Sequence, residues 1–296
     1  MAAPSLRTAS LAVFLSSAIW GLYWVPLRVF EARGIEGGWS VTLLNMPPLL
    51  VLIPLMLWQG AGLRKHGHHA VLIGLFAGAG LAFYASGLVY STVLRATLLF
   101  YLTPVWSTLL GMVWLGERVT WGRWAAIVVG LAGMGLLLGG EADETHPLNL
   151  GDALAFLSGI FWATGASMIR RYNAVPLLPM AGFQFAFTAG LAASIALIFG
   201  PREMPQVAPA IEVLPLAMIA SILFILPTVW IIFWAQKVLS PGRAGLLMMS
   251  EALVAVISAS IFLPEERMGT IAWIGAVMII AACLIELAAS APERED

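Results

Sequence analysis

The chain has 296 residues, of which 60% are hydrophobic and only 10% are charged, and its mean hydropathy is +0.92. Soluble domains are about 45–50% apolar and about 25% charged, so this composition excludes a water-soluble globular domain and predicts a protein embedded in lipid. The net charge of −1 gives no reason to expect a nucleic-acid partner, and the single cysteine, Cys283, excludes a disulfide framework.

Ten apolar stretches are each long enough to cross a bilayer. A hydrocarbon core of about 30 Å requires about 20 apolar residues in a helix, because unpaired backbone groups are not tolerated in lipid. In chain order the predicted spans are 8–30, 39–58, 70–92, 95–115, 121–139, 150–170, 177–199, 213–236, 243–263 and 268–289. The first resembles a signal peptide, but similar stretches follow, so we interpret it as a retained helix. The predicted fold class is an all-α integral membrane protein.

The basic residues indicate how the spans are oriented, because cytoplasmic loops of membrane proteins are enriched in Lys and Arg. If the N-terminus is cytoplasmic, the inside segments hold ten basic residues: Arg7, Arg64, Lys65, Arg118, Arg123, Arg170, Arg171, Lys237, Arg243 and Arg294. The outside segments then hold five: Arg28, Arg33, Arg95, Arg202 and Arg267. We therefore predict that both termini are cytoplasmic.

The chain divides into two related halves, which we predict to be residues 1–146 and 147–296. Arg95-Ala96-x-Leu98-Leu99 recurs 148 positions later as Arg243-Ala244-x-Leu246-Leu247, and Trp20 corresponds to Trp162 near the start of the second half. Since each half holds an odd number of spans, the second half enters the membrane from the opposite side. Such inverted repeats are typical of alternating access, with a substrate site near the membrane midplane. We therefore predict a secondary or facilitative transporter of small organic solutes.

Several motifs resemble the EamA branch of the drug/metabolite transporter superfamily. They are Trp20-Gly21, Thr103-Pro104, Gly116-Glu117-Arg118, Glu251 and Glu265. The family often has Glu-Pro in the ninth span, whereas Glu251 is followed here by Ala252, so a proline break at that point is in doubt. The aromatic richness is most similar to the YddG-type aromatic amino acid exporters. The resemblance implies export of aromatic and other neutral amino acids across the bacterial inner membrane.

Aromatic and polar residues inside the spans are the candidate substrate-binding groups, since such side chains usually face the bundle interior. Helical spacing places Trp20, Tyr23 and Trp24 on one face of the first span, and Tyr101 and Pro104 on one face of the fourth. Stacked rings suit planar solutes. The other candidates are Asn45, Tyr84, Trp162, Gln184, Met248 and Glu251.

Prolines and one acid inside the spans add a polar component to the predicted site. A proline deprives the carbonyl four residues earlier of its donor, so Pro48 frees Leu44 and Pro104 frees Phe100. Such carbonyls require a neighbour, water or a cation. Glu251 lies near the centre of its span and is a candidate proton carrier.

Each of these assignments has a structural alternative. Tryptophans also form interfacial belts, which fits Trp58, Trp121 and Trp273, and buried amides also join neighbouring helices. Exporters of drugs or organic cations are the main functional alternative, and a channel or an intramembrane enzyme is the alternative from another class. We expect no catalytic residues, cofactor or metal, and we interpret His66, His68 and His69 as a solvated loop. The predicted partners are a small-molecule substrate and the lipid bilayer, and the predicted state is a monomer, with a dimer as the alternative.

Overall fold

The computed structural model describes residues 5–58, 60–91, 93–138, 147–200, 205–262 and 268–288. Within this part of the chain all secondary structure is helical, and ten segments are long and apolar enough to cross a membrane. They are Leu6–Glu31, Gly38–Trp58, Lys65–Tyr90, Arg95–Leu115, Trp121–Leu138, Leu150–Arg171, Leu177–Phe199, Val207–Gln236, Pro241–Phe262 and Thr270–Ala288. The predicted all-α fold with ten spans is confirmed.

Half of the spans are single helices and half are interrupted. The single helices are α5 (Gly60–Tyr90), α8 (Trp121–Leu138), α9 (Leu150–Arg171), α10 (Leu177–Phe199) and α15 (Thr270–Ala288). The interrupted spans are α1 (Leu6–Trp20) with α2 (Trp24–Glu31), α3 (Gly38–Asn45) with α4 (Pro47–Trp58), α6 (Val93–Phe100) with α7 (Thr103–Leu115), α11 (Val207–Ile219) with the π-helix η2 (Ala220–Ile225) and α12 (Leu226–Gln236), and α13 (Pro241–Met248) with α14 (Ser250–Phe262).

Hydroxyl side chains satisfy two of the carbonyls that prolines deprive of a donor. The Ser221 hydroxyl of η2 donates a 2.6 Å hydrogen bond to the Leu44 carbonyl, and the Thr103 hydroxyl donates to the Phe100 carbonyl. The polar groups exposed by these breaks are therefore paired inside the protein, as the absence of water in hydrocarbon requires. The ninth span breaks at Met249 without a proline, so the missing Glu-Pro sequence does not prevent an interruption there.

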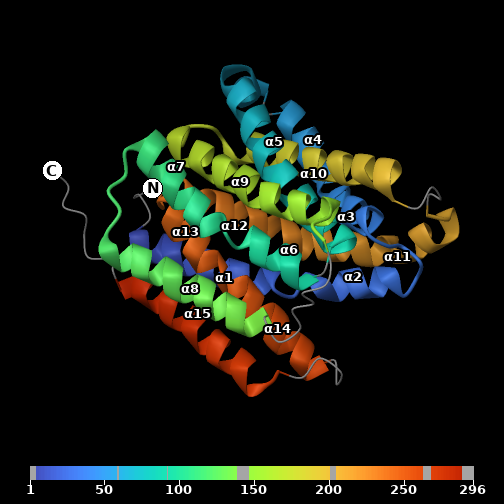
Figure 1. Cartoon of the computed structure of the whole chain (residues 1–296). Helices are drawn as coiled ribbons and strands as arrows, with labels where there is room; N and C mark the ends of the chain where they lie inside the picture. Colours follow the sequence, from blue (N-terminus) through green and yellow to red (C-terminus); the bar gives the residue numbers. More distant parts are fainter. Residues whose placement is uncertain are drawn as a thin grey trace.

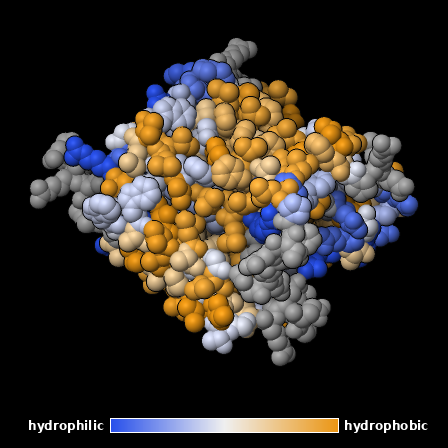
Figure 2. Space-filling view, viewed as in Figure 1, coloured by the Kyte–Doolittle hydropathy of each residue, from blue (hydrophilic) through white to orange (hydrophobic). Residues whose placement is uncertain are grey.

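The long helices pack in two groups (Figure 1). α5 lies against α9 and α10, whereas α8 and α15 lie side by side at the opposite edge of the bundle. Glycines permit the close approach of α5 to its neighbours, because a Cβ at Gly78 would lie 2.7 Å from the Gln184 carbonyl oxygen of α10. Hydrophobic residues cover most of the face shown in Figure 2, as expected for a surface in contact with lipid. Trp58 and Trp121, at helix ends, are more than four-fifths exposed, as an interfacial belt requires.

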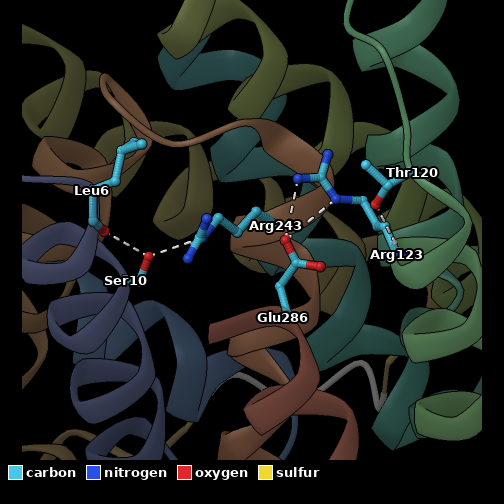
Figure 3. A network of polar contacts seen from close by, with 6 residues as sticks. All are labelled: Leu6, Ser10, Thr120, Arg123, Arg243 and Glu286. Atoms are coloured by element: carbon cyan, nitrogen blue, oxygen red, sulfur yellow. Dashed lines mark hydrogen bonds and ion pairs between the residues drawn. The ribbon is translucent and has the colours of Figure 1, made fainter. Parts of the chain in front are cut away.

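The start of the first span and the end of the last span lie at the same end of the bundle. Arg243, in the first turn of α13, donates a 2.9 Å hydrogen bond to Ser10 in α1. Close by, Arg123 of α8 forms a 3.1 Å ion pair with Glu286 in the last turn of α15 (Figure 3). We call this the Ser10 end. The opposite end, where α6 and α9 begin, is called the Arg95 end.

The histidine cluster differs from the predicted loop. His66, His68 and His69 lie in the first third of α5, which begins at Gly60, and the His69 ring packs 4.0 Å from the Tyr172 ring. Hydropathy could not reveal this extension, since helix length beyond the bilayer does not depend on apolar residues.

Candidate substrate pocket

A cavity lies at the centre of the bundle, where both halves of the chain meet. α1, α5 and α6 of the first half and α9, α12, α13 and α14 of the second half line it. Its lining residues are Ser17, Trp20, Leu81, Tyr84, Phe100, Trp162, Val229, Ile232, Met248 and Glu251. The space open to water-sized occupants is about 30 Å³, which is room for one or two water molecules.

Eight of the lining residues form four pairs that the repeat relates to one another. Trp20 and Trp162 are 142 positions apart, and Phe100 and Met248 are 148 positions apart. The second offset also relates Leu81 to Val229 and Tyr84 to Ile232. Equivalent positions of the two halves thus face one another across the cavity, which lies where an axis relating inverted repeats would pass.

Aromatic rings dominate the first-half wall of the pocket. The Tyr84 and Phe100 rings are stacked with their centroids 4.3 Å apart and their planes 28° apart. Trp20 stacks on Tyr23 with a centroid distance of 5.0 Å and an interplanar angle of 5°. Stacked rings hold one another in fixed orientations, so the wall presents flat apolar surfaces to the cavity.

The polar groups of the pocket are few and incompletely paired. Glu251 is buried close to Tyr84 and Tyr101, and no ion pair joins it to a lysine or arginine among the described residues. The Ser17 hydroxyl and the Trp162 indole nitrogen are also buried, and neither has a hydrogen-bond partner. A buried donor without a partner destabilises a protein by about 1–3 kcal/mol. These groups therefore favour an occupant that accepts hydrogen bonds.

Two glycines bring the pocket residues into place. Gly21 follows α1 and packs against the backbone of α14, where a Cβ would overlap the Glu251 carbonyl oxygen and lie 2.9 Å from the Ala255 nitrogen. Gly80 of α5 contacts the backbone of Trp162, whose nitrogen would lie 2.9 Å from a Cβ. The helix carrying Trp20 can thus approach Glu251, and α5 can approach the helix carrying Trp162.

Five of the predicted site residues line the cavity: Trp20, Tyr84, Trp162, Met248 and Glu251. Tyr23 and Tyr101 lie directly behind this lining, against Trp20 and Phe100 respectively. The remaining four, which lie elsewhere, are Trp24, Asn45, Pro104 and Gln184.

Each of these four has a contact that joins helices or shapes one. The Trp24 indole donates a 3.0 Å hydrogen bond to Ser258 of α14. The Asn45 amide donates 2.8 Å to the Val41 carbonyl within α3. Gln184 donates 2.9 Å to Thr188, whose hydroxyl also contacts the Gly78 carbonyl. Pro104 is the second residue of α7 and packs against Gly245.

Five lining residues were missed: Ser17, Leu81, Phe100, Val229 and Ile232. Most of them are apolar and carry no signal that separates a pocket from a core. The repeat offset contained part of the missing information, because adding 148 to Tyr84 gives Ile232 and subtracting it from Met248 gives Phe100. Ser17 lies one helical turn before Trp20, on the same face of α1.

The fold and the pocket define a multi-pass membrane protein whose two halves share one central site. The model of the EamA-like transporter family matches the chain twice, over residues 7–139 and 149–287, and the chain belongs to this family. The family resemblance and the two repeats predicted from the sequence are confirmed. The chain is therefore a member of a transporter family, while the division between residues 146 and 147 stays a prediction.

Relatives within the family are named for different solutes. The chain is 26% identical over 280 residues to a probable terminal-alkyne amino-acid exporter of Streptantibioticus cattleyicolor, covering 80% of this chain and 94% of the relative. It is 33% identical over 129 residues to the aromatic amino acid exporter YddG of Ancylobacter novellus, covering 42% and 44%. It is 29% identical over 111 residues to an S-adenosylmethionine uptake transporter of Rickettsia bellii, covering 37% and 38%. The last two matches thus span less than half of those relatives. A crystal structure of a protein that is 21% identical has the same fold, with a TM-score of 0.70 over 94% of this chain and 96% of that one.

Proposed function

We propose that this chain exports aromatic and other neutral amino acids from the bacterial cytoplasm across the inner membrane, by alternating access through the central pocket. Two relatives named as amino-acid exporters support this proposal, one of them along almost its whole length. The observation that carries it is the combination of flat aromatic walls and one acid in a central cavity, two of whose lining residues also hold buried donors without partners.

The chemistry of the pocket suits a zwitterion with a planar side chain. Glu251 offers a carboxylate to an ammonium group, and the unpaired donors of Ser17 and Trp162 match a carboxylate. The rings of Trp20, Tyr84 and Phe100 would stack with an aromatic side chain. An amino acid would thereby satisfy donors that otherwise remain buried without partners.

The pocket must widen before it accepts such a molecule. With room for one or two water molecules, the cavity as it stands is too small for an aromatic amino acid. The structure therefore corresponds to a contracted state, and substrate binding requires the helices around the cavity to separate. The breaks at Gly21 and Met249 lie beside lining residues and provide points at which the flanking helices can tilt.

Export of organic cations is the second candidate, and one observation favours it. Among the described residues that line the cavity, Glu251 is the only charged one, and none is a lysine or arginine that would pair with a substrate carboxylate. A cation surrounded by aromatic faces and one acid is a favourable arrangement. The two candidates differ in whether substrate binding needs the hydrogen-bond donors of Ser17 and Trp162.

Counterflow with purified protein in liposomes separates the two candidates. The compared solutes are labelled tryptophan, phenylalanine, threonine and a quaternary amine. Exchange of the aromatic amino acids supports the proposal, whereas exchange of the quaternary amine alone would replace it with cation export. Exchange of none of the four would exclude both candidates.

Replacing Trp162 with phenylalanine tests the role of its indole donor. Trp162→Phe retains an aromatic ring but removes the N–H group, so we expect the apparent affinity for tryptophan to fall about tenfold, as the loss of one hydrogen bond to a charged group predicts. Trp24→Phe is the matched control, because the Trp24 donor bonds Ser258 outside the pocket. An equal loss of affinity in both variants would show that Trp162 does not bind the substrate.

A further inference from the structure

An ion pair joins the two halves of the chain at the Arg95 end. The Arg95 guanidinium in the first turn of α6 lies 2.7 Å from the Asp152 carboxylate in the first turn of α9. Asp152 is buried, accepts a hydrogen bond from the Ser91 hydroxyl, and forms a capping box with Asn149. α6 belongs to the first half and α9 opens the second, so this contact bridges them.

A related contact joins the halves at the Ser10 end (Figure 3). The Arg243 guanidinium in the first turn of α13 donates 2.9 Å to the Ser10 hydroxyl of α1, which in turn donates 2.7 Å to the Leu6 carbonyl. Arg243 and Ser10 are both buried. Here α13 belongs to the second half and α1 opens the first, so at this end the second half supplies the arginine and the first half supplies its partner.

The repeat relates these two contacts. Arg95 and Arg243 are 148 positions apart, the offset that also relates Phe100 to Met248 in the pocket. Ser10 and Asp152 are 142 positions apart, the offset that relates Trp20 to Trp162. The two contacts are therefore equivalent positions of the fold, with a carboxylate at one end and a hydroxyl at the other.

Both contacts stand at the same separation from the pocket. On α1 and α9, Ser10 and Asp152 each precede the lining tryptophan by ten residues, or about 15 Å along a helix. This is about half of the hydrocarbon thickness. Both arginines also occupy the first turn of a helix, where the helix dipole disfavours a cation. At both ends, a partner from the other half of the chain offsets this unfavourable interaction of the arginine with the helix dipole.

We propose that Arg95–Asp152 and Arg243–Ser10 are the two gates of the transport cycle. The proposal rests on the alternating access of the proposed function. Opening the pocket toward one end separates the helices that begin there, which breaks the contact at that end while the other holds. Both contacts are formed here, in agreement with the small volume of the cavity.

Labelling of a pocket cysteine measures which gate is open without requiring a known substrate. Cys283 is replaced by alanine, and Ser17→Cys places a single thiol in the pocket. A membrane-impermeant maleimide is then applied from each side of the membrane. Two further single-cysteine variants report which side the reagent reaches. They are Val207→Cys at the Arg95 end and Trp121→Cys at the Ser10 end, and both positions are highly exposed.

Asp152→Asn removes the charge at the Arg95 end, and we expect labelling of the pocket from that end to rise about tenfold. Arg95→Gln should produce the same rise, and the double variant should produce no further rise because both changes break one contact. Ser10→Asp adds a carboxylate at the other end and should lower labelling from the Ser10 end.

Glu212→Gln is the matched control. It removes an exposed ion pair with Arg33, at the same end as Arg95, and should leave labelling unchanged. Labelling that responds to Glu212→Gln as strongly as to Asp152→Asn would overturn the gate assignment, as would unchanged labelling in a folded Asp152→Asn or Arg95→Gln protein. A pocket thiol that is labelled from one side only in every variant would instead contradict alternating access itself.

Discussion

Glu251 is the one carboxyl among the described residues that line the pocket, and a carboxyl exchanges a proton more readily than the phenol of Tyr84. Replacement by glutamine retains the size of the side chain and abolishes that exchange. If Glu251 couples transport to protons, uptake by Glu251→Gln into liposomes should no longer respond to an imposed pH gradient, whereas Glu212→Gln, at an exposed acid, should respond like the original chain. A Glu251→Gln protein with the original pH response would assign this residue a structural role.

The direction in which a single side chain points was predicted better within a regular helix than beyond a helix break. Trp20 lies within α1, and helical spacing placed it correctly toward the interior of the bundle. Trp24 was assigned to the same face, but Gly21 to Tyr23 form a turn, and α2 begins with a different rotation. The Trp24 indole consequently reaches Ser258 of α14. A helical wheel assumes continuous rotation, which an interrupted span does not have.

The interruption of the second span depends on a hydrogen bond from another helix. Removing the Ser221 hydroxyl would leave the Leu44 carbonyl buried and unpaired, so we expect Ser221→Ala to lower the free energy of unfolding in detergent by about 1–3 kcal/mol. Ser194→Ala is the control, because that exposed hydroxyl bonds a carbonyl of its own helix, and its effect should be about 0.5 kcal/mol or less. Equal stabilities of the two variants would show that water satisfies Leu44.

Whole spans were predictable because only long apolar helices are stable across lipid, and the hydropathy of the sequence identifies such helices directly. The break before Thr103-Pro104 was also visible, since proline removes a backbone donor. The break at Met249 and the π-helix η2 could not be read in the same way. At Met249 the sequence has no proline, and the register of η2 depends on its packing against α11, α12 and α4.

The arrangement of the whole molecule predicts the location of both termini. α1 begins and α15 ends at the Ser10 end, so reporters fused to the two termini should lie on the same side of the membrane. The excess of basic residues at that end predicts the cytoplasm. A reporter that is active only in the cytoplasm, fused in turn to each terminus, measures this. Activity from one fusion and silence from the other would contradict both the shared end and the inverted repeat.

The two halves are not identical where they meet, and this has a consequence for the cargo. A pocket with perfect two-fold symmetry would accept any molecule in two indistinguishable poses. Glu251 corresponds to Thr103 and Ser17 corresponds to Gly159 in the other half, and neither Thr103 nor Gly159 is among the described lining residues, so this carboxyl and this hydroxyl each line the pocket without a counterpart. Because the two halves differ in this way, the two poses are no longer equivalent, and a solute with a charged head and a flat tail has one preferred pose. Each transported molecule therefore presents the same part of itself first to the compartment that receives it.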